Sequence, residues 1–176
     1  MMHIDRLSLP RAVEESPHAD AVRALFSPAQ PGNPAALPGI ELDASVQTAL
    51  QRALRTGRLS RGLETALEKL ENEKRGLEHL RRQTGERQAA RVSRLILVSS
   101  DASERLRGEI ERAIERHAPR VLALALTADS ARIGSLLFGA NAHAKVLLLD
   151  HKEAVAGMLI AAAQQRSGPG RPSARS

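Results

Sequence analysis

The stretch RLILVSSDAS, residues 94–103, decides the fold of this chain. Its first six residues are mostly apolar, and a short apolar run of this length is typical of a buried strand. Asp101 follows, and Glu104 stands three residues further on, which is the spacing of a capping box at a helix N-terminus. The stretch therefore predicts a strand that passes directly into a helix.

Two similar apolar runs lie further along the chain. Val121–Leu126 (VLALAL) and residues 145–149 (KVLLL) predict two more buried strands. Thr127 follows the first of them as a candidate N-cap, and Asp150 with Glu153 follows the second as a capping box. Strands that are apolar throughout and linked by helices indicate a parallel or mixed sheet with both faces covered.

Upstream of these strands the chain predicts two more helices around a short strand. The first helix begins at a candidate N-cap, Ser45, and ends at Gly57. Residues 58–61 predict a short strand, and a long Leu-lined helix follows from Gly62 to about Gln83. The predicted fold is an α/β class, three-layer α/β/α sandwich over residues 43–166, with a mixed four-stranded sheet and an extended second helix.

The two ends of the chain differ from this region in composition. Residues 1–42 hold six of the nine prolines, so we expect a flexible Pro-rich N-terminal segment. Residues 167–176 are mainly Gly, Pro, Ser and Arg, which predicts a disordered basic tail. A chain of 176 residues then carries one folded domain.

The overall composition narrows the classes of function. The net charge of +6 favours polyanionic partners, and the absence of Cys excludes disulfides, thiolate metal sites and Cys nucleophiles. Trp and Tyr are absent and Phe occurs twice, so the aromatic platforms on which single-stranded bases usually stack are lacking. No signal-peptide pattern and no apolar run near ~18 residues is present, so we expect a cytoplasmic protein with no membrane segment.

Candidate catalytic residues are few, and each has a structural explanation. His151, Lys152 and Glu153 occupy the expected first turn of a helix, and the six histidines show no metal-ligand spacing. Residues 99–101 follow a strand, where α/β folds place ligand sites, although helix capping explains them better. No GxxxxGK or GxGxxG loop is present. We expect no enzyme activity, no cofactor and no metal, with a ligand-binding α/β enzyme as a minor alternative.

Four stretches of sequence carry a resemblance to a known family. They are ALRTGRLSRGLETALEKL (residues 53–70), RLILVSSDAS (94–103), ADSARIGSLLFG (128–139) and AKVLLLDHKEAV (144–155). Together with the order of elements, they resemble the kink-turn RNA-binding ribosomal proteins, the archaeal L-seven-Ae group and its small bacterial relatives. The resemblance covers residues 45–165 and implies non-catalytic binding of structured RNA in a ribosomal setting.

The resemblance also implies which residues face RNA. Arg61 and Lys69 would neutralise phosphates, and a loop of small residues would let the backbone approach the RNA closely. The full set is Arg61, Gly62, Thr65, Lys69, Ser100, Asp101, Gly139, Ala140, Asn141, Ala142 and His143.

The start of the long helix departs from the family pattern. The family opens its RNA-reading helix with an amide, an acid and a basic residue one turn later, whereas Glu64, Thr65 and Glu68 occupy the matching positions. Acidic side chains facing phosphate oppose RNA binding. The alternative prediction is therefore a protein-interaction adaptor with the same fold and no RNA binding. In that case residues 62–83 contact a protein partner or a second copy of the chain.

Overall fold

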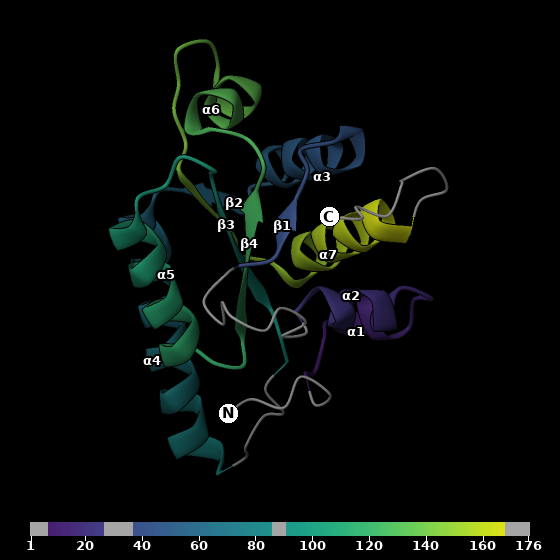
Figure 1. Ribbon diagram of the computed structural model, residues 1–176. Helices are drawn as coiled ribbons and strands as arrows, with labels where there is room; N and C mark the ends of the chain where they lie inside the picture. The colour runs from purple at the N-terminus through teal and green to yellow at the C-terminus, as the bar shows by residue number, and fades with distance from the viewer. Residues whose placement is uncertain (1–6, 27–36, 86–90, 168–176) are drawn as a thin grey trace.

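A mixed five-stranded sheet forms the centre of the computed structural model, which describes residues 7–26, 37–85 and 91–167 (Figure 1). The strand order is β1-β4-β3-β5-β2. β5 runs antiparallel to both of its neighbours, whereas β1, β4 and β3 are parallel to one another. The strands are β1 (Gly39–Ile40), β2 (Leu59–Arg61), β3 (Arg94–Val98), β4 (Val121–Leu126) and β5 (Val146–Leu149).

The three apolar runs predicted as strands are confirmed as β3, β4 and β5, and the short strand upstream as β2. The predicted strand number of four is wrong, because β1 adds a fifth strand at the edge of the sheet beside β4. β1 has two residues and follows Pro38, so it is too short to show the alternation by which a strand is recognised in a sequence.

Alternate residues of each strand point to opposite faces of the sheet, and this divides the core in two. In β3, Leu95 and Leu97 join one buried cluster, while Ile96 and Val98 join the other. Both clusters are aliphatic, as the near absence of aromatic residues requires. Helices cover both faces, which explains why the strands are apolar throughout.

Figure 1 shows two groups of helices on the two sides of the sheet. One side carries α4 (Leu63–Thr84) and α5 (Glu104–Arg116). The other side carries α1 (Arg11–Glu14), α2 (Ala19–Leu25), α3 (Ala44–Arg55) and α7 (Lys152–Ser167). The short helix α6 (Ser130–Phe138) lies at one end of the sheet, at the top of the view.

The N-terminal segment differs from the flexible one expected for residues 1–42. Leu9, Val13, Val22 and Leu25 are buried in the core, and α1 and α2 pack against α7. Because α7 is covered by the sheet on one side and by helices on the other, it is apolar around most of its circumference. The short helices contain too few turns for a periodic pattern, which is why composition alone suggested a linker. Residues 168–176 of the expected tail lie outside the described residues.

Several predicted helix caps are wrong by one or two residues. Each observed cap has an extended backbone, and its side chain accepts a hydrogen bond from an amide of the first turn. Neighbouring polar residues compete for this position, and the sequence does not rank them. The caps are Asp43 for α3, Ser103 for α5 and Asp129 for α6, in place of Ser45, Asp101 and Thr127.

The long helix predicted from Gly62 is confirmed as α4, which has 22 residues. At about 1.5 Å per residue its length is roughly 33 Å, about twice that of a five-residue strand such as β3. It ends before Gly85, which adopts the left-handed conformation that favours glycine.

Candidate nucleic-acid interface

One edge of the sheet gathers most of the residues predicted to contact RNA. β2, β3 and β4 end at this edge, and β5 begins there, because β5 runs in the opposite direction. The connections at this edge are residues 62, 99–103, 127–129 and 139–145. The fold thus brings together segments that lie up to about 80 residues apart in the chain.

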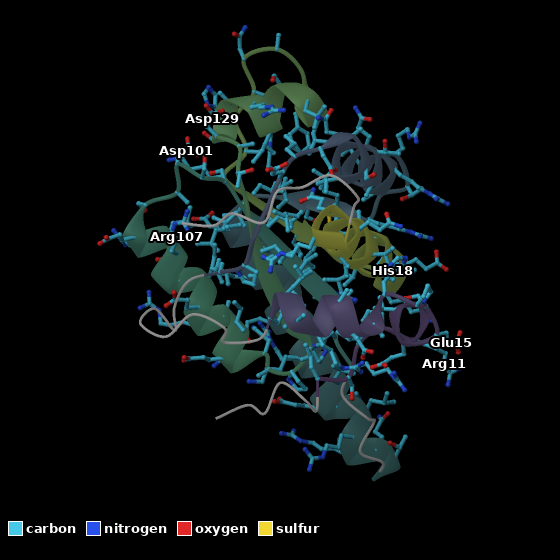
Figure 2. The ribbon with its side chains drawn as sticks, turned by 45° about the vertical axis from the view of Figure 1, so that its right-hand side comes forward. Arg11, Glu15, His18, Asp101, Arg107 and Asp129 are labelled. Carbon is cyan, nitrogen blue, oxygen red and sulfur yellow. The ribbon has the colours of Figure 1, made fainter. Side chains whose placement is uncertain are left out.

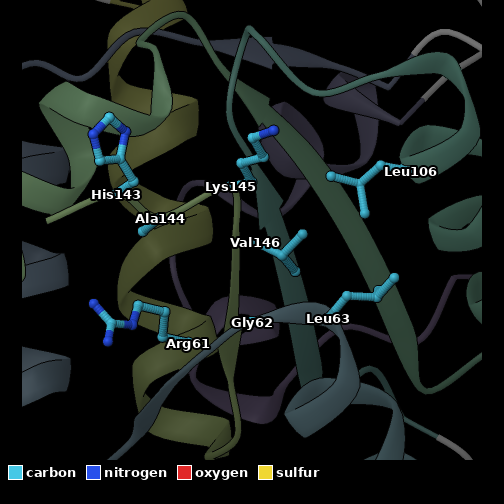
Figure 3. Close-up of a pocket in the computed structure, with 8 residues that line it drawn as sticks. All are labelled: Arg61, Gly62, Leu63, Leu106, His143, Ala144, Lys145 and Val146. Carbon is cyan, nitrogen blue, oxygen red and sulfur yellow. The ribbon is translucent and has the colours of Figure 1, made fainter.

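A shallow depression of about 600 Å³ opens at this edge (Figure 3). Three of the predicted residues, Arg61, Gly62 and His143, line it. Arg61 and His143 lie on one side of the backbone that enters β5, and Leu63 and Leu106 lie on the other. The complete lining is Arg61, Gly62, Leu63, Leu106, His143, Ala144, Lys145 and Val146.

The N-terminus of α4 forms one wall of the depression. Gly62 has a φ of 97°, a conformation that L side chains rarely adopt, and its N–H group donates to the Val146 carbonyl oxygen at 2.9 Å. No side chain caps the helix. Among the described residues, the amides of Leu63, Glu64 and Thr65 have no acceptor. These amides lie at the positive end of the helix dipole, which favours an anion.

Two cations at the depression have no acidic partner. Arg61 and Lys145 are exposed, and within the described part of the chain neither forms an ion pair. The Arg61 guanidinium lies 4.5 Å from the centre of the Phe138 ring, an arrangement that orients the cation and leaves its N–H groups at the surface. The imidazole of His143 is also exposed.

The predicted loop of small residues rests directly on α6. A side chain at Gly134 would overlap the backbone of Ala142 and lie 2.6 Å from the His143 nitrogen. Gly139 (φ 107°) and Asn141 (φ 68°) have positive φ angles, and the Ala142 N–H donates to the Gly139 carbonyl at 3.1 Å. Residues 139–143 therefore form a tight turn, and Ala140 and Asn141 are exposed on it.

Asp101 holds this edge together instead of capping α5. Its two carboxylate oxygens accept from the Ser130 N–H at 2.9 Å and from the Ser130 hydroxyl at 2.7 Å, at the start of α6. The hydroxyls of Ser99 and Ser130 lower the pKa of Asp101 to about 2, although only the Ser130 contacts have full hydrogen-bond geometry. Figure 2 shows Asp101 beside Asp129, the N-cap of the same helix. Ser100 is exposed, and its N–H donates to the Ala128 carbonyl.

Lys69 lies away from the depression and already has an anionic partner. Its ammonium group lies 2.7 Å from an Asp150 carboxylate oxygen and 2.5 Å from the Ser60 hydroxyl, which in turn donates to Asp150 at 3.1 Å. Asp150 was predicted as a helix cap, but this cluster joins it to β2 and α4 instead. Thr65 is exposed on α4 and is not among the lining residues.

The sequence analysis missed Lys145 and the apolar residues of the depression. Lys145 was assigned to the start of a strand, and its position directly after the loop was the available signal. Leu63, Leu106 and Val146 resemble any other core residue in the sequence. Across the described ranges, no three His, Cys, Asp or Glu side chains are placed to hold a metal ion, and no helix is long and apolar enough to cross a membrane.

Comparisons with known proteins place the chain only at the level of a mixed α/β protein. No protein-family model matches the sequence, and no curated protein matches it. Among solved structures, the chain is similar to a protein with unknown function from Bacillus halodurans, with 16% sequence identity and a TM-score of 0.47. The match covers 67% of this chain and 98% of that one.

Proposed function

We propose that this protein binds structured RNA, without catalysis, at the edge of the sheet that carries the depression. The observation that supports this best is the convergence of Arg61, Lys145, the uncapped N-terminus of α4 and the loop 139–143 on one open surface. In this proposal the chain is a three-layer α/β/α sandwich of the kink-turn-binding type, which the sequence resemblance suggests independently.

Phosphate groups are bound by Arg61 and Lys145 with the free amides of α4. Arg61 presents a planar fork of donors that suits phosphate, and its contact with Phe138 limits the freedom lost on binding. Lys145 takes the role that the sequence analysis gave to Lys69, whose charge is balanced by Asp150. The exposed acid Glu64 lies one residue from the depression and weakens the attraction for phosphate.

A nucleotide turned out of its stack fits the depression itself. Leu63, Leu106 and Val146 provide an apolar surface for a base, and His143 and Lys145 provide polar groups at the rim. The turn at residues 139–143 allows close approach of the RNA backbone, because its side chains are small. This mode of binding needs no aromatic platform, in agreement with the composition.

The test compares the affinity of the protein for a kink-turn RNA and for a straight duplex of equal length, over a series of salt concentrations. We expect tighter binding of the kink-turn RNA and a steep fall of affinity with salt. Arg61→Ala and Lys145→Ala should each weaken binding about five- to tenfold and lower the salt slope by about 1.

Arg112→Ala is the matched control, because Arg112 is exposed on α5 and does not line the depression. Its binding curve should follow that of the original protein. Absence of RNA binding at low salt, or an equal loss in the control variant, would contradict the proposal.

A further inference from the structure

The C-terminal end of α4 extends beyond the sheet, at the edge opposite the proposed RNA-binding edge (Figures 1 and 2). Residues 75–85 are all exposed. They include Leu77 and Leu80, which are 36% and 40% exposed and are the large exposed hydrophobic residues of the described chain. We call residues 74–84 the α4 extension.

The α4 extension continues the side of the helix that packs on the core. Ala66 and Leu70 are fully buried against the sheet on this side, and at 3.6 residues per turn Leu77 follows Leu70 on it. Glu73 is the last α4 residue on this side with a partner at the edge of the sheet, and it pairs with Arg94 and Arg120 at 2.9 Å. Beyond Glu73 the same stripe has no sheet beneath it.

The α4 extension is strongly basic. It contains four basic residues and one acidic residue, Glu78. Lys74 and Arg81 lie on the same side as Leu77, because they are three residues before it and four after it. The nearby acids do not offset this charge, since Glu71 pairs with Arg116, and Glu73 pairs with Arg94 and Arg120. Within the described residues, the four basic residues form no ion pair; they are Lys74, Arg75, Arg81 and Arg82.

We propose that the α4 extension docks an acidic amphipathic helix of a partner protein. The leucines provide the apolar contact, and Lys74 and Arg81 beside Leu77 select acidic residues on the partner. A second copy of this chain would bring two basic surfaces together, which disfavours self-association. RNA would neutralise the charge but would leave the leucines without an apolar partner.

The experiment uses the full chain and a synthetic helical peptide of about 21 residues, with Leu at the a and d positions and Glu at e and g. The control peptide carries Lys in place of Glu. We expect the acidic peptide to bind at least about tenfold more tightly than the basic one, with an affinity that falls with salt. Leu77→Ser with Leu80→Ser should abolish peptide binding, and Arg81→Glu should weaken it and favour the basic peptide.

The variants change only exposed side chains, so unchanged far-ultraviolet circular dichroism and thermal midpoint serve as the folding check. RNA affinity should be unaltered in these variants, which separates this proposal from the proposed RNA binding. Equal binding of the two peptides, or none, overturns the proposal. So does a dimer of the original protein that the double Leu variant dissociates, or RNA binding that requires the α4 extension.

Discussion

Gly134 in α6 lies directly beneath the backbone of Ala142, so closely that no side chain fits between them. This contact sets the position of the loop 139–143 above the depression. Gly134 is also fully within the helix, where glycine by itself is unfavourable relative to alanine. The space needed by the Ala142 carbonyl therefore explains the residue better than local helix preference does.

Gly134→Ala is expected to destabilise the protein by about 1–3 kcal/mol, because the new methyl group meets backbone that cannot move aside without shifting the loop. RNA affinity should fall together with stability. Equilibrium unfolding in denaturant measures the first effect and RNA titration the second. Gly108→Ala in α5 is the control, because a side chain there meets open space, and we expect a gain of about 0.5–1 kcal/mol. A Gly134→Ala variant as stable as the Gly108→Ala variant would contradict the contact.

Asp101 should make stability depend on pH in the acid range. Its folded pKa of about 2 lies below the ordinary value of 3.8, so the carboxylate contributes stability above pH 3.8. This contribution is lost as the pH falls from 3.8 to 2. Asp101→Asn should reduce the change in unfolding free energy over this range.

Ser103→Ala provides the comparison for Asp101. It removes the N-cap of α5 and should cost about 1 kcal/mol, with no change in pH dependence, because a hydroxyl does not titrate there. An unchanged acid profile in Asp101→Asn would show that the Ser130 contacts do not hold the charged form.

His117 should destabilise the protein as the pH falls below neutrality. It is 4% exposed at the end of α5, its Nδ1 has no partner among the described residues, and burial lowers its pKa. The groups around it are Glu71 and Lys74 of α4 with Arg116 and Arg120. Since the unfolded chain binds a proton near pH 6.5 more readily than the folded chain does, unfolding is favoured as the pH falls through that value.

His117→Gln should be less stable than the original protein at pH 8, and its stability should change less between pH 8 and pH 5. Thermal unfolding at a series of pH values measures both effects. If the variant keeps the full pH dependence of the original protein in this range, other groups cause it.

Lys69 should stabilise the fold without contributing to RNA binding. Lys69→Met leaves the mostly buried Asp150 carboxylate without its cation, and we expect a loss of about 1–2 kcal/mol, reduced because the lysine is 44% exposed. Lys69→Met combined with Asp150→Asn should cost less than the sum of the two single changes. RNA affinity and its salt slope should stay unchanged in Lys69→Met. A loss of RNA affinity comparable with that of Arg61→Ala would return Lys69 to the binding surface.

The sequence correctly predicted the parts of the fold that follow from local pattern. β3, β4 and β5 are continuous apolar runs, and the Leu spacing of α4 extends over many turns. The helix caps were less predictable, because Ser and Asp residues stand next to one another before α5 and α6. Whether Asp101 caps α5 or joins Ser130 depends on how close β3 brings it to a segment about 30 residues later in the chain.

The sequence by itself determined the class of the protein, since apolar strands linked by amphipathic helices can bury their surfaces only as a covered sheet. It also determined the basic charge and the aliphatic core. The tertiary structure alone decided which charges remain free. Lys69 and Arg61 are both basic residues beside the start of α4, but Asp150 neutralises Lys69 while Arg61 stacks on Phe138 with its donors exposed. That difference depends on contacts between residues about 80 positions apart, which no local pattern contains.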